Sequence, residues 1–524
     1  MTHYEPFFYI ARLVLETGTP LSIATGRDDG IADNLLVRDA NDLPAIPGSS
    51  FAGVLRHAYQ RITSESQAKQ LFGNAKPKQS SKENEGESDN PSFVHVSWGY
   101  LHDSRDKPVE ALLDPEDKRW HDDPVLKDAL QPMPIKRDHV KLNHRGVSDA
   151  KKQGKFDRTS LTMGHRFSIE LSLWSDYKDN SCWDKLIKLL QRPDFRLGGG
   201  TRRGLGKLKI VRCHKGMFNL RDRIQYIKFT QLTQSVANTT HLQAPSNLRD
   251  RTQYIQFTQL TQSVANTTHL QPLSMSAEQP SEHMTLNLKP LDGYRFGGGV
   301  EKLTQNTQAD LLAVTEPCVE WKKNQGRLSQ KRIVIPASGV KGALSHRVAY
   351  HYNALTGIFA DDEAVQAEPW AYVGENNRAV KTLFGYVEEK TTAKKEVAAQ
   401  MGCLIFDDVY IDRSERQQTL QPVEYTHNGI DRFTGGVREG VLFVEEVVTD
   451  TQPFKLNITV ALPSNRQPTS KMWQALHLAL TDLVEGDLAL GAGGGRGHGY
   501  FEGSWITGKE WLESKINKET LDAT

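Results

Sequence analysis

The chain has 524 residues, too many for one ordinary hydrophobic core and enough for two. Its hydrophobic content of 38% includes no apolar run that could span a bilayer, and its four cysteines form no Cys-x-x-Cys pair, which argues against a zinc site or a disulfide framework. The net charge is only +1, but residues 195–216 hold seven Lys or Arg and no acid. The N-terminal residues lack a secretion-signal pattern, so we expect a cytoplasmic protein.

The first half of the chain alternates between strand and helix patterns. Strands are predicted over 7–15, 93–101, 167–173 and 207–211. Helices are predicted over 49–62, with Ser49 and Ser50 as N-cap residues, and over 183–190. Residues 17–42 are predicted to be rich in loops, and residues 77–91 to form a polar surface loop.

Three motifs of the first half return in the same order in the second half. The stretch 46–57, which begins Ile-Pro-Gly-Ser-Ser, returns over 335–346 as Ile-Pro-Ala-Ser-Gly. Leu-Phe-Gly at 71–73 returns at 383–385, and a glycine-rich run at 197–206 returns at 490–499. Ordered matches of this kind indicate two copies of one domain in tandem. The second copy also repeats an alternating strand at 454–462 and a helix at about 471–485.

The order strand, helix, strands, helix, strand predicts an α+β fold. We expect two tandem ferredoxin-like or RRM-like domains with large β-hairpin and loop insertions. The predicted boundaries are 1–216 for the first domain, 217–284 for a linker, 285–510 for the second domain and 511–524 for a C-terminal tail.

The linker contains a repeat of its own. Residues 219–243 and 247–271 match at 23 of 25 positions, differing only at Ile224/Thr252 and Lys228/Gln256. Two copies are too few for a solenoid, and the segment is rich in Gln and Thr. A spacer is the favoured interpretation, and a contact with RNA or a partner is the alternative.

The repeated motifs suit contact with a sugar-phosphate backbone. A helix N-terminus offers unpaired backbone N–H groups to a phosphate. The glycine-rich runs can present backbone amides to an anion while basic side chains reach outward. The alternative is structural, namely capped helices and glycine turns packed inside each domain. The residues predicted to bind RNA at these motifs are Ser49, Ser50, Arg56, Arg202, Arg203, Lys207, Ser338, Lys341, Arg496 and His498.

The ordered combination resembles the RAMP superfamily of CRISPR-associated proteins. More narrowly, it is similar to the Cas-seven-type backbone subunits of type III effector complexes, with two subunits fused as in a type III-D-like system. The resemblance covers about residues 6–215 and 285–505. It implies a guide RNA held through phosphates and riboses, with specificity left to base pairing. It also implies complementary target RNA and other RAMP and large subunits as partners, and no membrane.

The resemblance places a protruding β-hairpin, the thumb, at 139–164 and at 423–446. In relatives this hairpin inserts across the guide–target duplex. It adds Lys141 and Arg145 in the first copy and Arg432 in the second to the expected RNA contacts. The second thumb keeps the family's pattern better than the first.

The resemblance also gives Asp33 a catalytic role. In the family, an aspartate in a Gly-Ile-x-Asp-Asn-like loop ahead of the Ile-Pro-Gly-Ser-Ser motif cleaves target RNA, and Asp33 stands at that place. Its carboxylate would hold Mg²⁺ or another divalent cation, or assist attack by the adjacent 2′-hydroxyl. The structural alternative is a turn-forming aspartate, since Asp28, Asp29 and Asp39 share the loop.

We therefore predict an endoribonuclease that cleaves guide-paired target RNA within an assembled complex, with one metal-assisted site in the first domain. The second copy has Lys322 where the acid would stand, and the nearby Glu316 and Glu320 match nothing. Three alternatives stay open: a non-catalytic guide-RNA scaffold, a guide-processing RAMP endoribonuclease and a nucleotide-binding metabolic enzyme. The Ile-Pro-Gly-Ser-Ser motif argues against the second, and the absence of a Gly-x-x-x-x-Gly-Lys-Ser/Thr pattern argues against the third.

Overall fold

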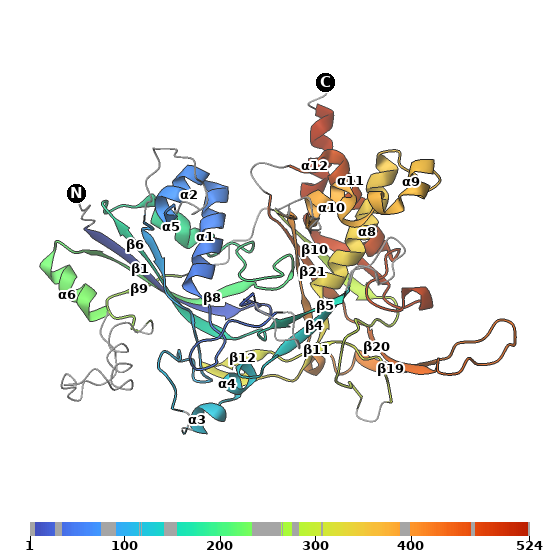
Figure 1. The fold of residues 1–524 in the computed structure, drawn as a ribbon, viewed down its shortest axis with the longest axis horizontal. Helices are drawn as coiled ribbons and strands as arrows, with labels where there is room; N and C mark the ends of the chain where they lie inside the picture. Colours follow the sequence, from blue (N-terminus) through green and yellow to red (C-terminus); the bar gives the residue numbers. More distant parts are fainter. Residues whose placement is uncertain are drawn as a thin grey trace, which may run out of the picture.

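A computed structural model of the chain shows two domains side by side, each built on a β-sheet with helices packed on one face (Figure 1). The long helices that cover the two sheets lie along the upper side in this view, whereas the short helices α3 (Lys118–His121) and α4 (Pro124–Ala129) lie below, and a long β-hairpin projects from the second domain. The structure describes residues 6–26, 34–74, 91–114, 116, 118–140, 155–232, 264, 266–274, 282–304, 308–387, 399–462 and 467–521.

The first domain has the ferredoxin-like order of strands and helices. Its main sheet runs β2-β6-β1-β8, and every neighbouring pair in this path is antiparallel. Helix α1 follows the first strand and helix α5 the third, so the chain order is strand, helix, strand, strand, helix, strand. The bounds are β1 Phe7–Thr17, α1 Gly48–Ile62, β2 Val94–Val96, β6 Arg166–Ser175, α5 Ser181–Leu189 and β8 Leu208–Asn219.

The second domain repeats this plan strand for strand. Its sheet runs β22-β10-β21-β17, again with antiparallel neighbours, and two long helices pack on it. The bounds are β10 His283–Pro290, α8 Ala337–Leu355, β17 Leu404–Asp407, β21 Phe454–Val460, α11 Ser470–Glu485 and β22 Phe501–Thr507. The predicted α+β fold of two tandem ferredoxin-like domains is confirmed.

Alternating apolar residues form each core. In β6, the side chains of Phe167, Ile169, Leu171 and Leu173 are all buried and belong to one cluster with Phe51 of α1. In the second domain, the strands β10 and β21 pack in the same way against α8 and α11. The period of two in the strands and the apolar stripe of each helix thus produce the layered arrangement.

Some local predictions differ from the structure. The strand predicted over 93–101 is two short strands, β2 and β3 (Tyr100–Leu101), because Gly99 between them pairs with Ile46 instead. The predicted spacer is more than a tether: helix α6 (Arg223–Leu232) packs on the first sheet, and β9 (Gln271–Pro272) pairs with β8.

The remaining elements surround the two sheets. Those of the first domain are α2 Glu65–Phe72, α3 Lys118–His121, α4 Pro124–Ala129, β4 Ile135–Val140, β5 Lys155–Ser160 and β7 Arg203–Gly204. Those of the second are β11 Thr315–Glu316, β12 Val319–Lys322, β13 Gln325–Leu328, β14 Arg332–Ile335, α9 Glu363–Ala367, η2 Pro369–Tyr372, η3 Gly374–Asn376, α10 Arg378–Leu383, β15 Gly385–Val387, β16 Ala399–Met401, β18 Val409–Ile411, η4 Arg413–Glu415, β19 Leu420–His427, β20 Phe443–Asp450, η5 Gly494–Arg496 and α12 Lys509–Leu521.

Each domain inserts a hairpin into the other. The β4–β5 hairpin of the first domain reaches the second, while the β12–β13 hairpin of the second lies against the first (Figure 1). In the second contact, the Trp321 indole N–H donates to the carbonyl of Gly164 at 2.8 Å, and the backbone N–H of Gly326 donates to Ser104 O at 2.7 Å.

Arg137 of β4 is the centre of the first contact. Its guanidinium donates to both carboxylate oxygens of Glu316, at 2.6 and 2.7 Å, and to Asp408 Oδ2 at 2.7 Å. Burial alone would lower the pKa of Arg137, but the carboxylates of Asp408 and Glu316 raise it well above its usual value. Asp408 also accepts the backbone N–H of Ala337, at 2.7 Å, so one carboxylate joins the hairpin to the first turn of α8.

Replacing Arg137 by Ala is expected to lower the free energy of unfolding by about 3–5 kcal/mol, because the substitution leaves two buried carboxylates without their cation. Urea unfolding monitored by circular dichroism measures the change. The control is Lys136→Ala on the same strand, whose side chain is 41% exposed and pairs with Asp157 at 2.8 Å. An exposed pair of this kind contributes up to about 1 kcal/mol. Equal losses in the two variants would contradict the central role of Arg137.

Candidate nucleic-acid interface

The first glycine-rich run joins the two domains. Its strand β7 pairs in parallel with β17, Arg203 beside Phe406 and Gly204 beside Asp407, and so extends the second domain's sheet. Gly204 has φ +97°, and a Cβ at this position would collide with the Asp408 carboxylate and lie 2.8 Å from Ala337 Cβ. Only glycine fits this close approach. The run is therefore part of the domain interface as well as a candidate RNA contact.

Three predicted RNA contacts meet at this interface: Arg202, Arg203 and Lys341, which we call the interdomain cation cluster. The first two come from the glycine run and the third from α8. Burial, followed by the positive charges of Arg203 and Arg202, lowers the pKa of Lys341 to about 7. Burial, followed by the charges of Arg61 and Arg196, lowers the pKa of Arg202 to about 10. Because the positive charges of Arg203 and Arg202 help to lower the pKa of Lys341, this place favours an anion.

The contacts of the cluster leave donors free for such an anion. Lys341 Nζ donates to the carbonyl of Phe384 at 2.8 Å, which uses one of its three N–H bonds. Arg203 lies over the ring of Phe156, with its guanidinium carbon 5.4 Å from the ring centroid. Arg202 Nε is buried and has no hydrogen-bond partner among the residues that the structure describes. Lys341 and Arg203 thus retain donors for an RNA phosphate, whereas the Arg202 Nε atom is closed off from solvent.

Lys207 and Arg196 are different, because the second domain provides their acid. Lys207 Nζ donates to Asp407 Oδ2 at 2.8 Å, and the Arg196 guanidinium donates to Asp407 Oδ1. Burial alone would raise the pKa of Asp407, but the charges of Arg196 and Lys207 hold it below its usual value. The basic run with no acid in its own sequence is therefore partly neutralised by folding. Lys207 fastens the domains together.

Helix α1 begins one residue earlier than the predicted 49–62, and α8 begins in the same way after a proline. Pro47 is the N-cap residue of α1 and Pro336 that of α8, and neither makes a side-chain capping bond. The prediction that Ser49 and Ser50 cap α1 is therefore wrong: they stand within its first turn, with Ser49 exposed and Ser50 half-buried. Arg56 is half-buried one turn further along α1, and Ser338 is half-buried in the first turn of α8.

The second glycine-rich run is held by its own domain. Arg496 donates from Nη2 to both carboxylate oxygens of Glu445, each at 3.0 Å, and His498 is buried 3.9 Å from the same carboxylate. His427 Nε2 also lies 2.7 Å from Glu445. Burial alone would raise the pKa of Glu445, but Arg496, His427 and Arg295 together lower it. The first run thus contributes to the cation cluster, while Arg496 and His498 are bound to a local acid.

The thumb of the second domain is the projecting hairpin of Figure 1, formed by β19 and β20. Arg432 and Phe433 are exposed in the loop that joins the strands, and the Phe433 side chain is fully accessible at 101%. Asp431 fixes this loop by accepting the backbone N–H groups of Phe433 and Thr434, each at 2.9 Å. In the first domain, β4 and β5 form the equivalent hairpin, and Lys141 and Arg145 lie outside the described residues.

Asp33 also lies outside the described residues, but both flanks of its loop are placed. Ala24 and Leu36 form a β-bridge, and the backbone N–H of Thr25 donates to Leu35 O at 2.9 Å. Two residues before this bridge, Ser22 O accepts the backbone N–H of Gly199 at 2.7 Å. Ser22 therefore lies beside the first glycine-rich run.

A model of the RAMP superfamily matches residues 14–209 and 295–502, one match in each domain. The chain belongs to the RAMP superfamily. It is a tandem of two RAMP domains, and RAMP proteins work in CRISPR RNA–protein complexes. A search of curated proteins found no match.

The positions around Lys322 in the second RAMP domain have structural contacts. Glu316 binds Arg137 across the domain interface, and Glu320 Oε1 accepts a bond from Arg332 at 2.6 Å. Lys322 ends strand β12, in the hairpin that lies against the first RAMP domain. The two acids that match nothing in the family are thus occupied by arginines.

A buried polar network in the first RAMP domain was not anticipated from the sequence. His102 lies 2.8 Å from both Asp106 Oδ1 and Ser168 Oγ, which are the contacts of a Ser-His-Asp relay. Burial alone would raise the pKa of Asp106, but His102 and Arg212 lower it to about 2. The His102 side chain is only 1% exposed, so no substrate can reach it. The network is structural.

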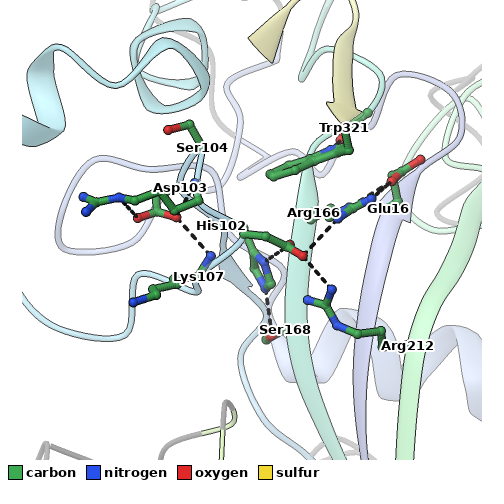
Figure 2. Close-up of polar contacts among 12 residues, drawn as sticks. Glu16, His102, Asp103, Ser104, Lys107, Arg166, Ser168, Arg212 and Trp321 are labelled. Atoms are coloured by element: carbon green, nitrogen blue, oxygen red, sulfur yellow. Dashed lines mark hydrogen bonds and ion pairs between the residues drawn. The ribbon is translucent and has the colours of Figure 1, made fainter. Parts of the chain in front are cut away.

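Figure 2 shows how this network joins the domains. Arg166 lies between Glu16 and Trp321, with its guanidinium carbon 4.2 Å from the Trp321 ring centroid. Trp321 belongs to the β12–β13 hairpin of the second RAMP domain. His102 and Asp106 are four positions apart, but the other partners are 60 or more positions apart, as in the bond from Arg166 to Asp106, and no short motif reveals such a set.

Within the described residues, no group of three or more His, Cys, Asp or Glu side chains is arranged to hold a metal ion. None of the helices in the described part of the chain is both long and apolar enough to cross a membrane.

Replacing Arg202 and Arg203 together by Ala is expected to weaken RNA binding for every sequence alike. The slope of log affinity against log salt should become shallower by about 1–2, because two phosphate contacts are lost. Fluorescence anisotropy with several unrelated single-stranded RNAs measures both effects. The control is Lys185→Ala with Lys188→Ala, which removes the same charge from the exposed face of α5. A loss restricted to particular RNA sequences would contradict backbone recognition.

RNA affinity is also expected to fall as the pH rises from about 6.5 to 8.5. Lys341 loses its proton through this interval in the free protein, since burial and its arginine neighbours lower its pKa to about 7. A bound phosphate raises the pKa of Lys341. At pH values above the free protein's pKa of about 7, RNA affinity therefore falls by up to about tenfold per pH unit. Anisotropy at constant ionic strength measures the profile. Lys341→Arg should flatten it, and identical profiles for the two proteins would exclude Lys341 from the RNA contact.

Proposed function

We propose that this chain is a guide-RNA-binding backbone subunit of a type III, type III-D-like, CRISPR effector complex, and that its first domain cleaves target RNA paired to the guide. The observation that carries the proposal is the interdomain cation cluster. Arg202 and Arg203 come from the first RAMP domain and Lys341 from the second. Neither domain alone would form the complete anion site. An RNA chain that runs across the surfaces of both domains would bind at this anion site.

The exposed thumb supports the proposal that the subunit binds a guide–target RNA duplex. Phe433 and Arg432 stand together at the end of a hairpin that extends away from the domain (Figure 1). An aromatic ring can stack on a base, and an adjacent guanidinium can bind a phosphate. A hairpin with these side chains suits insertion across a guide–target duplex.

Asp33 is the proposed catalytic residue. Ser22, five positions before residues 27–33, lies beside the first glycine-rich run, whose arginines would hold the RNA backbone. A carboxylate there can assist attack by the 2′-hydroxyl on the adjacent phosphate. A divalent cation such as Mg²⁺ would stabilise the charge that develops on the phosphate oxygens.

The second domain is proposed to bind without cutting. Lys322 stands at the position that matches Asp33, and Glu320 is paired with Arg332. One chain would then make one cut, or one regularly spaced set of cuts when several copies assemble.

Asp33→Ala is expected to abolish that cut while leaving assembly and target binding near wild type. The substitution removes a loop carboxylate and opens no core cavity, so stability should change by about 0.5 kcal/mol or less. Gel analysis of labelled target RNA bound to the reconstituted complex measures the cleavage, and EDTA should suppress the same cut.

The matched control is Glu320→Ala, which removes a carboxylate from the second domain and should leave the cleavage pattern intact. Glu316 is unsuitable as a control because it binds Arg137. Normal cleavage by the Asp33 variant would make the chain a binding scaffold whose chemistry belongs to another subunit. Cleavage of repeat RNA by the isolated chain without metal would instead indicate a guide-processing enzyme.

A further inference from the structure

The backbone bonds of the two glycine-rich runs identify equivalent positions in the two domains. In the first domain, the backbone N–H of Gly199 donates to Ser22 O at 2.7 Å. In the second domain, the backbone N–H of Ala492, at the matching place of the second run, donates to Arg295 O at 2.8 Å. Ser22 and Arg295 are therefore equivalent, and each follows the first sheet strand of its domain.

The equivalence extends across the loop that follows. The next residue of each domain, Ile23 or Phe296, accepts a backbone N–H through its carbonyl at 2.8 Å. The donor is Val37 in the first domain and Val314 in the second. These two valines are therefore equivalent as well, and they mark the end of the same loop in each domain.

An aspartate stands four positions before each of these valines: Asp33 in the first domain and Asp310 in the second. With the valines as the common reference, Asp310 is the counterpart of Asp33. Asp310 is exposed, and its Oδ2 accepts the backbone N–H of Val444 at 2.9 Å. Its Oδ1 makes no hydrogen bond to a described residue, so this oxygen can accept a proton.

A count along the sequence gives Lys322 instead, because the count crosses the β12–β13 hairpin. The carbonyls of the two valines accept the backbone N–H groups of Ala45, at 3.1 Å, and of Val334, at 3.0 Å. These equivalent bonds span 8 positions in the first domain and 20 in the second. The 12 additional positions include the hairpin, and Lys322 is displaced from Asp310 by the same 12 positions.

The surroundings of Asp310 repeat a set of side chains of the first domain. At the base of each thumb, a histidine lies opposite a phenylalanine with ring centroids 4.9 Å apart: His139 and Phe156 in the first domain, His427 and Phe443 in the second. An arginine of each glycine-rich run lies over the phenylalanine, Arg203 at 5.4 Å and Arg496 at 5.9 Å from the ring centroid. Phe443 is the neighbour of Val444, so Asp310 and Arg496 both lie at the base of the second thumb.

We propose that Asp310 is a second catalytic residue, and that each RAMP domain of the chain cuts the target RNA at a position of its own. The proposal rests on the proposed function of Asp33. It gives the second domain a cutting role in place of binding alone, because the binding-only role depends on the match to Lys322. The Arg496 side chain is 41% exposed although it binds Glu445, and it would hold the RNA phosphate beside Asp310.

In the proposed step, the Asp310 carboxylate accepts the proton of a 2′-hydroxyl while the 2′ oxygen attacks the adjacent phosphorus. The bond between phosphorus and the 5′ oxygen breaks, and this oxygen takes a proton from water. The proton on the carboxylate then returns to the hydroxide that the water leaves. The products are a 2′,3′-cyclic phosphate and a 5′-hydroxyl.

Asp310→Asn tests the proposal in the reconstituted complex with target RNA labelled at one end. Asparagine keeps an acceptor for the Val444 N–H, so target binding and the thermal unfolding midpoint should stay near those of wild type. Wild type should cut at two positions, or in two regularly spaced series. Asp33→Asn should slow one cut by about 100-fold or more and Asp310→Asn the other, because each removes one general base. The double variant should not cut.

The matched control is Asp361→Asn, which changes an exposed aspartate just before α9 and should leave both cuts intact. Identical products from wild type and Asp310→Asn, with a cut lost in Asp33→Asn, would overturn the proposal and leave the proposed function of the first domain in place. Unchanged cleavage in both single variants and in the double variant would overturn the proposed function as well.

Discussion

The arrangement of the two domains depends on a buried ion pair between Arg137 and the carboxylates of Glu316 and Asp408. Asp408 also binds the first backbone N–H of α8 and lies against Gly204, so one side chain positions a hairpin, a helix and a loop. The net stabilisation from such buried pairs is small because desolvation offsets much of the attraction. Its effect is to fix one geometry. Any displacement of the domains would leave charges buried without partners.

The interdomain cation cluster exists only in that geometry. Arg202 and Arg203 reach Lys341 because β7 extends the sheet of the second domain. Without a bound anion, the like charges raise the free energy of the folded state, and a ligand that neutralises them stabilises the assembly. Lys207 and Arg496 differ in this respect, since Asp407 and Glu445 already satisfy them.

The sequence revealed the fold because its signals are local and repeated. Motif order, strand alternation and helix periodicity survive in both halves, and both sheets have the strand order that this pattern predicts. The sequence could not reveal the pairing of charges. Lys207 and Asp407 are 200 positions apart. The basic run 195–216, which has no acid of its own, was therefore expected to be a surface of unpaired positive charges. The start of α1 was also missed by one residue, because its N-cap residue is Pro47 and not Ser49 or Ser50. The role of Asp33 rests on family resemblance, since its loop lies outside the described residues.

The reciprocal hairpins have a consequence for how the two halves can diverge. In a stack of identical subunits, one sequence must serve as both donor and acceptor of every contact. Here the first domain keeps Arg137 as donor, and the second keeps Glu316 and Asp408 as acceptors. Covalent fusion makes the order of the halves permanent, so selection acts on each half for a single role. The β19–β20 hairpin could therefore specialise as a free arm, while its counterpart in the first half became a fastener.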